Sequence, residues 1–129
     1  MGKIVHDDVI DGALNIVKNN CNKIAFCETQ PTTFSEANTA KGSGGKSLAS
    51  VAATSGDFTA ANGDTNGRKL TSAAKNSVAV TDTGTGDHIA YLDTTGSRLL
   101  YVTTCTSRAV TAGDSVNIPA WKIEIADPT

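Results

Sequence analysis

The chain of 129 residues carries little charge, little proline and few aromatic side chains. Asp, Glu, Lys and Arg together make up 19% of it, against about 25% in an ordinary soluble domain. With three prolines and so little charge, the composition does not match a charged disordered tail. The net charge of −2 and the isoelectric point near 5.5 give no electrostatic reason to expect nucleic acid as a partner.

Long hydrophobic runs are also missing. No apolar stretch approaches the roughly 18 residues that a membrane-spanning helix needs. The beginning of the chain, MGKIVHDDVIDGALNIV, is amphipathic and acidic, unlike a secretory signal. We therefore expect no membrane partner.

Small polar residues are abundant. Thr, Ser, Asn and Gly supply 49 of the 129 positions, and 18 of these are Thr. Because β-branched Thr fits a pleated, half-exposed surface, the composition favours strands. The length is typical of one domain, so we expect residues 1–129 to form a single domain that needs neither a metal nor disulfides to fold.

The first twenty residues predict a helix over about 5–19. Apolar residues recur there at spacings of three and four, which places them on one helical stripe: Val5, Val9, Ile10, Ala13, Leu14 and Val17. Asp7 and Asp8 in the first turn and Lys18 in the last suit the helix dipole. The stripe has to be buried, either on the chain's own β-domain or on a neighbouring subunit.

From residue 22 to 126 the apolar period changes to two, and turn signals recur about every ten residues. This pattern predicts a mainly β fold, an antiparallel β-sandwich of jelly-roll or immunoglobulin-like type with the N-terminal helix added. Arg98–Thr106 is the strongest β run, and we expect it to be central. Pro119 predicts a bend or an edge in the last strand. The expected strands are 23–27, 47–53, 57–60, 68–73, 77–82, 88–93, 98–106, 108–111 and 116–126.

The segment 38–47, NTAKGSGGKS, is expected to be an exposed, mobile loop after a helical turn that begins at Thr33–Glu36. Its AKGSGGKS resembles a phosphate-binding loop in which Ala replaces the first Gly. That chemistry needs a buried strand before the loop and a helix after it. The preceding TTFSEANT is polar, so we favour a plain loop and expect no nucleotide cofactor.

Two further patterns fall short of metal sites. NGDTNG at 62–67 matches half of a calcium loop, but the carboxylate required at the twelfth position would be Ala73, so we favour a hairpin turn. The three cysteines form no CxxC pair and have no zinc-like spacing to the two histidines. Cys21 and Cys27 flank the first strand and can pair or cross-link subunits in an oxidising medium, although free thiols are the default. Cys105 is expected to be a small buried hydrophobe.

Catalytic signatures are scarce. There is no GxSxG elbow. Ser115 lies in an expected hairpin turn, and His88 is a base only if a partner approaches it in space. Asp87 and Asp93 can frame a site, although acidic residues beside turns are commonly turn formers. We expect no enzymatic activity.

Four stretches spread over the whole chain carry a resemblance: KIVHDDVIDGALNIVKNN, GDFTAANGDTNGRKLTSAAK, HIAYLDTTGSRLLYVTTCT and AVTAGDSVNIPAWKIEIADPT. Together they resemble a family of small structural proteins of tailed-bacteriophage virions. The layout GT…HIAYLD…LLYVT…TAGDSVNIPAW is also similar to β-sandwich modules of capsid-decorating and tail-fibre-associated phage proteins. The resemblance implies a virion part without catalysis, made in the cytoplasm of a bacterial host.

These observations lead to the hypothesis of a homo-oligomeric capsid decoration or cement protein, with copies of itself and the major capsid protein as partners. A tail, collar or fibre-associated protein is the alternative within that class. A carbohydrate- or receptor-binding β-sandwich is the competing class, but it needs exposed aromatic platforms, and six aromatic residues leave few to spare. The candidate assembly contacts lie in the helix, the 38–47 loop and the C-terminal tail: Val5, Val9, Ile10, Leu14, Lys41, Lys46, Asp127 and Thr129.

Overall fold

A computed structural model describes residues 2–129. Strand residues make up 47% of the chain and helix 20%, which confirms a mainly β, antiparallel fold with one main N-terminal helix. Short 3₁₀ turns occupy Lys41–Ser43 and Ser55–Asp57. The helices and strands are α1 (Asp7–Asn20), β1 (Lys23–Cys27), α2 (Phe34–Asn38), β2 (Ser47–Ala52), β3 (Phe58–Asn62), β4 (Arg68–Ser72), β5 (Lys75–Ala79), β6 (Gly84–Asp93), β7 (Arg98–Val110), β8 (Ser115–Ile118) and β9 (Trp121–Ile125).

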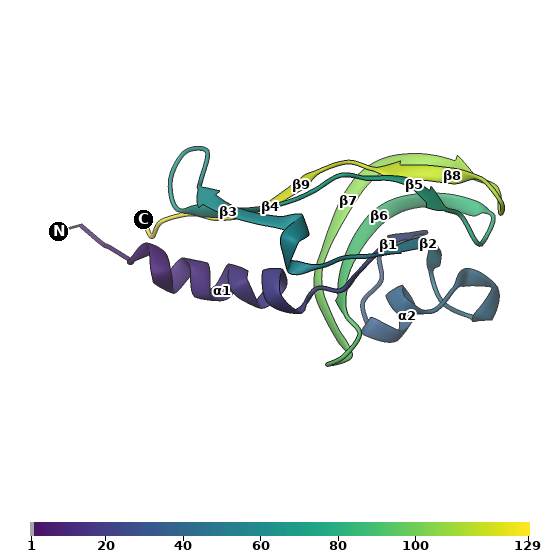
Figure 1. The fold of residues 1–129 in the computed structure, drawn as a ribbon, viewed down its shortest axis with the longest axis horizontal. Helices are drawn as coiled ribbons and strands as arrows, with labels where there is room; N and C mark the ends of the chain where they lie inside the picture. The colour runs from purple at the N-terminus through teal and green to yellow at the C-terminus, as the bar shows by residue number, and fades with distance from the viewer. Residues whose placement is uncertain (1) are drawn as a thin grey trace.

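The predicted N-terminal helix is confirmed, although it begins two residues later than expected. His6 is its N-cap, and its Nδ1 accepts a hydrogen bond of 3.1 Å from the backbone N–H of Asp8. Ile10, Leu14 and Val17 are buried. Their spacing of four and three residues puts them on one face, which packs against β3 and β4 (Figure 1).

One layer of the fold is a four-stranded antiparallel sheet in the order β2-β1-β6-β7. β1 is paired on both sides, and four of its five residues are buried. Its alternate side chains therefore serve two cores. Ile24 and Phe26 face the main core, whereas Ala25 and Cys27 join a smaller cluster that Ala37 of α2 covers on the other face.

The second layer is a long two-stranded ribbon, and β3 extends one end of it by pairing with β4. β4 pairs with β9 and β5 pairs with β8. Between these two pairings the ribbon is interrupted. On one side of the interruption Ser72 lies opposite Trp121. On the other side Lys75, three residues after Ser72, lies opposite Ile118, three residues before Trp121, so the register is the same on both sides of the break. Pro119 lies in that break, where it has no ladder hydrogen bond to lose. The predicted single strand 116–126 is therefore two strands, interrupted at the expected proline.

Two sequence-based expectations about the strongest β run are wrong. β7 is one continuous strand of 13 residues, so 108–111 is not a separate strand. It lies at the edge of its sheet rather than in the centre, because within residues 2–129 it pairs only with β6. A high density of β-branched and apolar residues indicates a strand, but it does not say which neighbours that strand finds.

The main core lies between the sheet and the ribbon, and α1 closes one end of it (Figure 1). Tyr91 is 1% exposed at its centre, where its hydroxyl lies 3.0 Å from Ser72 Oγ and connects the two layers. Phe26 requires Gly86, because a Cβ at that position would come within 2.1 Å of the Phe26 ring. Side chains from both layers and from the helix thus share one packed interior.

Candidate assembly surface

Helix α1 presents two different apolar faces. Ile10 and Leu14, which the sequence nominates as assembly contacts, are 5% and 2% exposed and belong to the chain's own core. Val5 is half-buried and packs against the same core. Ile10 and Leu14 are therefore core residues of the folded chain, which corrects their assignment as external contacts, whereas an external contact of Val5 stays a prediction.

Val9 behaves differently. It is 65% exposed. Ile16, which lies seven residues later on the same side of the helix, is 47% exposed. Ala13 lies between them and is exposed as well. We call Val9, Ala13 and Ile16 the exposed strip of α1. Together with Ile4, which is 95% exposed, Val9 and Ile16 are the large hydrophobic side chains that lie in solvent, and all three precede residue 17.

A partly buried ion pair holds α1 in place while the strip faces outward. Arg68 of β4 donates to both carboxylate oxygens of Asp11, from Nε at 2.8 Å and from Nη2 at 3.0 Å. This hydrogen bonding lowers the pKa of the Asp11 carboxyl. Such a two-point contact fixes orientation better than a single bond, so the rotation of the helix, and hence the position of the strip, is defined.

The two lysines of the 38–47 loop serve the chain itself. Lys41 Nζ lies 2.7 Å from Glu28 Oε2, and Lys46 Nζ lies 3.3 Å from Glu36 Oε2 and donates to the Gln30 carbonyl at 2.8 Å. Hydrogen bonds from Thr32 and from Lys46 lower the pKa of Glu36.

The phosphate-loop resemblance loses its required context, because strand β2 rather than a helix follows the loop. The loop is exposed at 41–44 and half-buried on either side, and it contains a 3₁₀ turn at Lys41–Ser43. Its mobility stays a prediction.

The C-terminal tail lies next to the N-terminal segment (Figure 1). Lys3 Nζ donates to the Thr129 carbonyl at 2.5 Å, and the Asp127 N–H donates to Asn66 Oδ1 at 3.0 Å. Both tail residues are exposed, as an external contact requires.

The half calcium loop is a hairpin connection between β3 and β4, as predicted. The Asp64 carboxylate forms ion pairs with Lys69 at 2.6 Å and with Lys122. Within residues 2–129, no group of three or more His, Cys, Asp or Glu side chains is arranged to hold a metal ion.

All three cysteines are free thiols, with Cys21 and Cys27 buried and Cys105 half-buried. Burial raises the pKa of Cys27 to about 12. Because Cys105 is half-buried, the expectation that it is a buried hydrophobe is only partly met.

The residues considered for catalysis do not converge. His88 Nδ1 lies 2.6 Å from Asp87 Oδ1, but both belong to consecutive positions of β6. Asp87 and Asp93 are separated by six residues of strand, roughly 20 Å, which is too far to frame one site. Asp93 instead accepts from the N–H groups of Thr95 and Gly96 and from Arg98, and it closes the β6–β7 turn.

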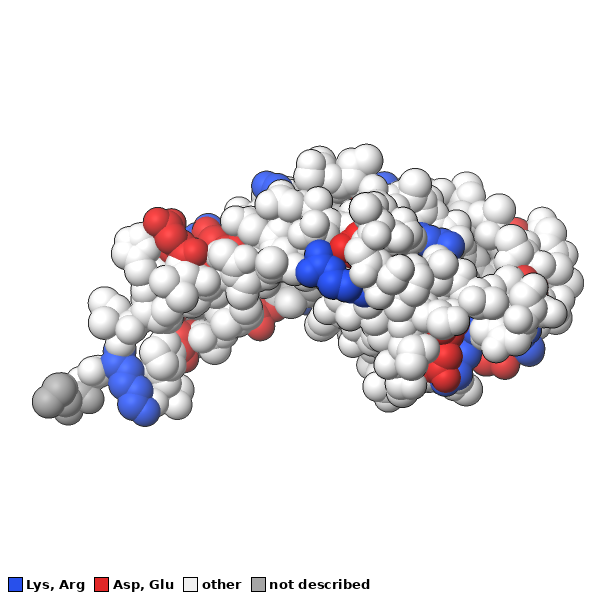
Figure 2. Space-filling view, turned by 90° about the horizontal axis from the view of Figure 1, so that it is seen from below, with Lys and Arg blue, Asp and Glu red and all other residues white. Residues whose placement is uncertain are grey.

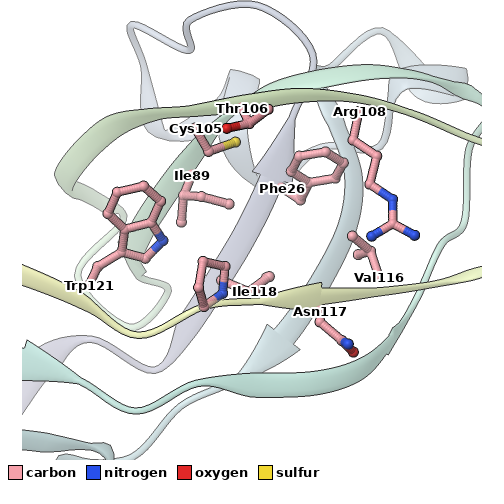
Figure 3. Close-up of a pocket in the computed structure, with 10 residues that line it drawn as sticks. Phe26, Ile89, Cys105, Thr106, Arg108, Val116, Asn117, Ile118 and Trp121 are labelled. Atoms are coloured by element: carbon pink, nitrogen blue, oxygen red, sulfur yellow. The ribbon is translucent and has the colours of Figure 1, made fainter.

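A cleft of about 230 Å³, which sequence reasoning missed, opens between β7 and the consecutive strands β8 and β9 (Figure 3). Phe26, Ile89 and Ile118 line its apolar interior, and Cys105 and Arg108 of β7 form one wall. Trp121 lines the opposite end, and its indole Nε1 is buried without a hydrogen-bond partner. The interruption at Pro119 is the one sequence signal that points to this region, because it marks where the ribbon strands stop pairing.

The comparisons leave the family open. Neither family models, nor curated proteins, nor solved structures gave a match to this chain. None of the helices in residues 2–129 has the length and apolarity needed to cross a membrane.

Proposed function

We propose that this chain is a homo-oligomeric structural protein of a tailed-bacteriophage virion, a decoration or cement protein of the capsid. One observation carries the proposal: among residues 2–129, the exposed large hydrophobic side chains all precede residue 17. Apolar side chains gathered in one region of a surface mark a docking site more often than scattered ones do. The exposed strip of α1 is the surface that contacts the shell.

Two further features support an assembly subunit. Charged side chains are sparse on the face seen in Figure 2, where they lie in small groups within a largely uncharged surface. Such a surface approaches a neighbouring protein without burying many charges, which would be costly. The resemblance of four stretches of the sequence to phage virion proteins is the reason for proposing a phage particle.

Counting copies in purified particles tests the proposal. Hundreds of copies on the head, measured by quantitative mass spectrometry and located by antibody labelling, are the expected result for a decoration protein. About a dozen copies or fewer at the tail or collar would favour the alternative virion role. Absence from particles, or glycan-array binding by the isolated protein, would overturn the proposal.

Val9→Asp sharpens the test, because it places a charge in the strip without touching the core. Binding of the variant to shells that lack the protein should be lost, while its circular dichroism spectrum and melting temperature stay close to those of the wild type. Asn19→Asp is the matched control, since it adds the same charge at an exposed helix position outside the strip. Equal loss with both variants would exclude the strip as the contact.

A further inference from the structure

We propose that the cleft between β7 and the consecutive strands β8 and β9 receives the N-terminal segment Gly2–His6 of a second copy of this chain. The inference deepens the proposed function and rests on it, because it names the partner and the contact by which copies associate. Three observations carry it: two open sheet edges, an unsatisfied donor beside the cleft, and a segment with an exposed apolar side chain that two acidic residues follow.

The first observation is that the fold is open along this flank. β7 and β8 are consecutive and joined by the short turn 111–114, yet they belong to different layers. Among the described residues, β7 pairs only with β6, β8 only with β5 and β9 only with β4. Both sides of the opening therefore present unpaired backbone N–H and C=O groups, which are a template for an added strand.

The second observation concerns the chemistry inside the cleft. Its interior is apolar, so it favours an aliphatic side chain. The Trp121 Nε1–H has no acceptor, and a buried donor without a partner is unfavourable. In Figure 3 the indole nitrogen lies on the side of the ring that faces the cleft. Because the Nε1 atom itself has almost no exposed surface, a backbone carbonyl of an inserted segment reaches it only when the indole ring shifts as the segment enters.

The third observation identifies the occupant. Gly2–His6 lies outside every helix and strand, and Ile4 is its most exposed side chain at 95%. Lys3 and Val5 contact their own chain, so the alternate residue Ile4 projects away from it. Figure 1 places this segment at the end of the molecule opposite β8, so the cleft it enters is that of another copy.

Charge agrees with this assignment. Arg108 lies in the cleft wall and forms no ion pair within residues 2–129, whereas Asp7 and Asp8 directly follow the inserted segment. Association of a segment at one end with a cleft at the other is heterologous, and such contacts close into rings when the rotation between copies permits.

The test uses the full chain and its single tryptophan, which lines the cleft and reports its occupancy. Sedimentation velocity and Trp121 emission are measured over a range of protein concentrations for the wild type, Ile4→Asp and Val9→Asp. The wild type and Val9→Asp should form oligomers with a blue shift of the emission. Ile4→Asp should raise the dissociation constant by about tenfold or more, as expected for a buried apolar anchor, and should show no shift.

Charge reversal provides an independent arm. Arg108→Glu should weaken association, and adding Asp7→Lys and Asp8→Lys on the same chain should restore it. If circular dichroism shows that Ile4→Asp is unfolded, the association of the charge-reversal variants decides the test. A wild type that stays monomeric, or oligomers with unchanged mass and emission in both Ile4→Asp and Arg108→Glu, would overturn the inference.

The outcome is separable from that of the proposed function. Particles that contain the protein, together with self-association that is independent of Ile4, would remove this inference and leave the virion role. Ile4-dependent oligomers of a protein absent from particles would remove the virion role and leave the cleft contact.

Discussion

Strands β1 and β7 belong to the same sheet but are stabilised in different ways. β1 has five residues, lies in the centre and is buried on both faces. β7 has 13 residues, lies at the edge and is mostly half-exposed or exposed. The longer run of strand-forming residues is thus the peripheral one. Burial on both faces, rather than length, marks the strand on which the core depends.

The largest expected effect tests this difference with two leucines that face each other. Leu92 of β6, the neighbour of β1, is fully buried, and its register partner Leu99 of β7 is half-buried. Leu92→Ala should lower the free energy of unfolding by about 2–5 kcal/mol through lost burial and a residual cavity. Leu99→Ala should cost less than half of that. Urea unfolding of both variants measures the difference.

Equal losses at the two leucines would break the comparison, because they would show that β7 contributes as much to the core as its central neighbours. Leu→Ala at both positions removes the same atoms, so the pair forms its own control.

The second prediction concerns the close approach of β6 to β1. Gly86→Ala introduces a Cβ that overlaps the Phe26 ring, and we expect a loss of about 1–3 kcal/mol from the forced repacking. Gly12→Ala is the control with the opposite sign. Nothing lies within 4 Å of its Cβ position in α1, so Ala should stabilise the chain by about 1 kcal/mol through helix propensity. Thermal unfolding of both variants checks these signs.

The third prediction compares the cysteines of the two strands. Cys27 of β1 is fully buried, and burial raises its pKa to about 12. At pH 8 it should react with a thiol reagent roughly a thousandfold more slowly than a free cysteine, since few thiolates form. Cys105 of β7 is half-buried in the cleft wall and should be labelled first, as peptide mass mapping would show. Earlier labelling of Cys27 would indicate that the centre of the sheet opens more readily than its edge.

The smallest expected effect lies in the turn that joins β6 to β7. Hydrogen bonding from the Gly96 N–H and from Arg98 lowers the pKa of Asp93. A lowered pKa in the folded state means stability that is present above the unfolded value, about 3.9, and is lost as the pH falls through the folded value. Asp93→Asn should therefore lower the melting temperature at pH 7, and the deficit should shrink below about pH 4. Asp127→Asn in the exposed tail is the control, and a constant deficit for Asp93→Asn at all pH values would contradict the assignment.

Much of the local structure follows from the sequence. The spacing of three and four between apolar residues predicts helix α1, and Thr33 caps α2 as expected, with its Oγ1 accepting from the Glu36 N–H at 3.2 Å. Pro119 interrupts the last strand where the sequence places a bend. In each case the cause lies within a few residues of its effect.

The assembly contacts show where that reasoning ends. Val9 and Ile10 are neighbours in one apolar pattern, but a helix turns by 100° per residue, and only contact with β3 and β4 decides which of them is buried. Lys41 and Lys46 look available in the sequence, yet Glu28 and Glu36 pair with them through the fold. The cleft at Trp121 exists because β7 does not pair with β8 or β9. No local sequence pattern predicts that these strands stay apart.

The abundance of Thr and Gly and the spacing of the apolar residues, by themselves, determined a chain of short strands and turns with one amphipathic helix. Those properties depend on backbone preferences and on the period of apolar residues, which act over a few positions. Which strand is central, which helix face is exposed and where the two layers separate were decided by the tertiary structure alone. These features depend on pairing between residues up to 69 positions apart, such as Lys23 and Leu92, whose energy appears only when the whole core is packed.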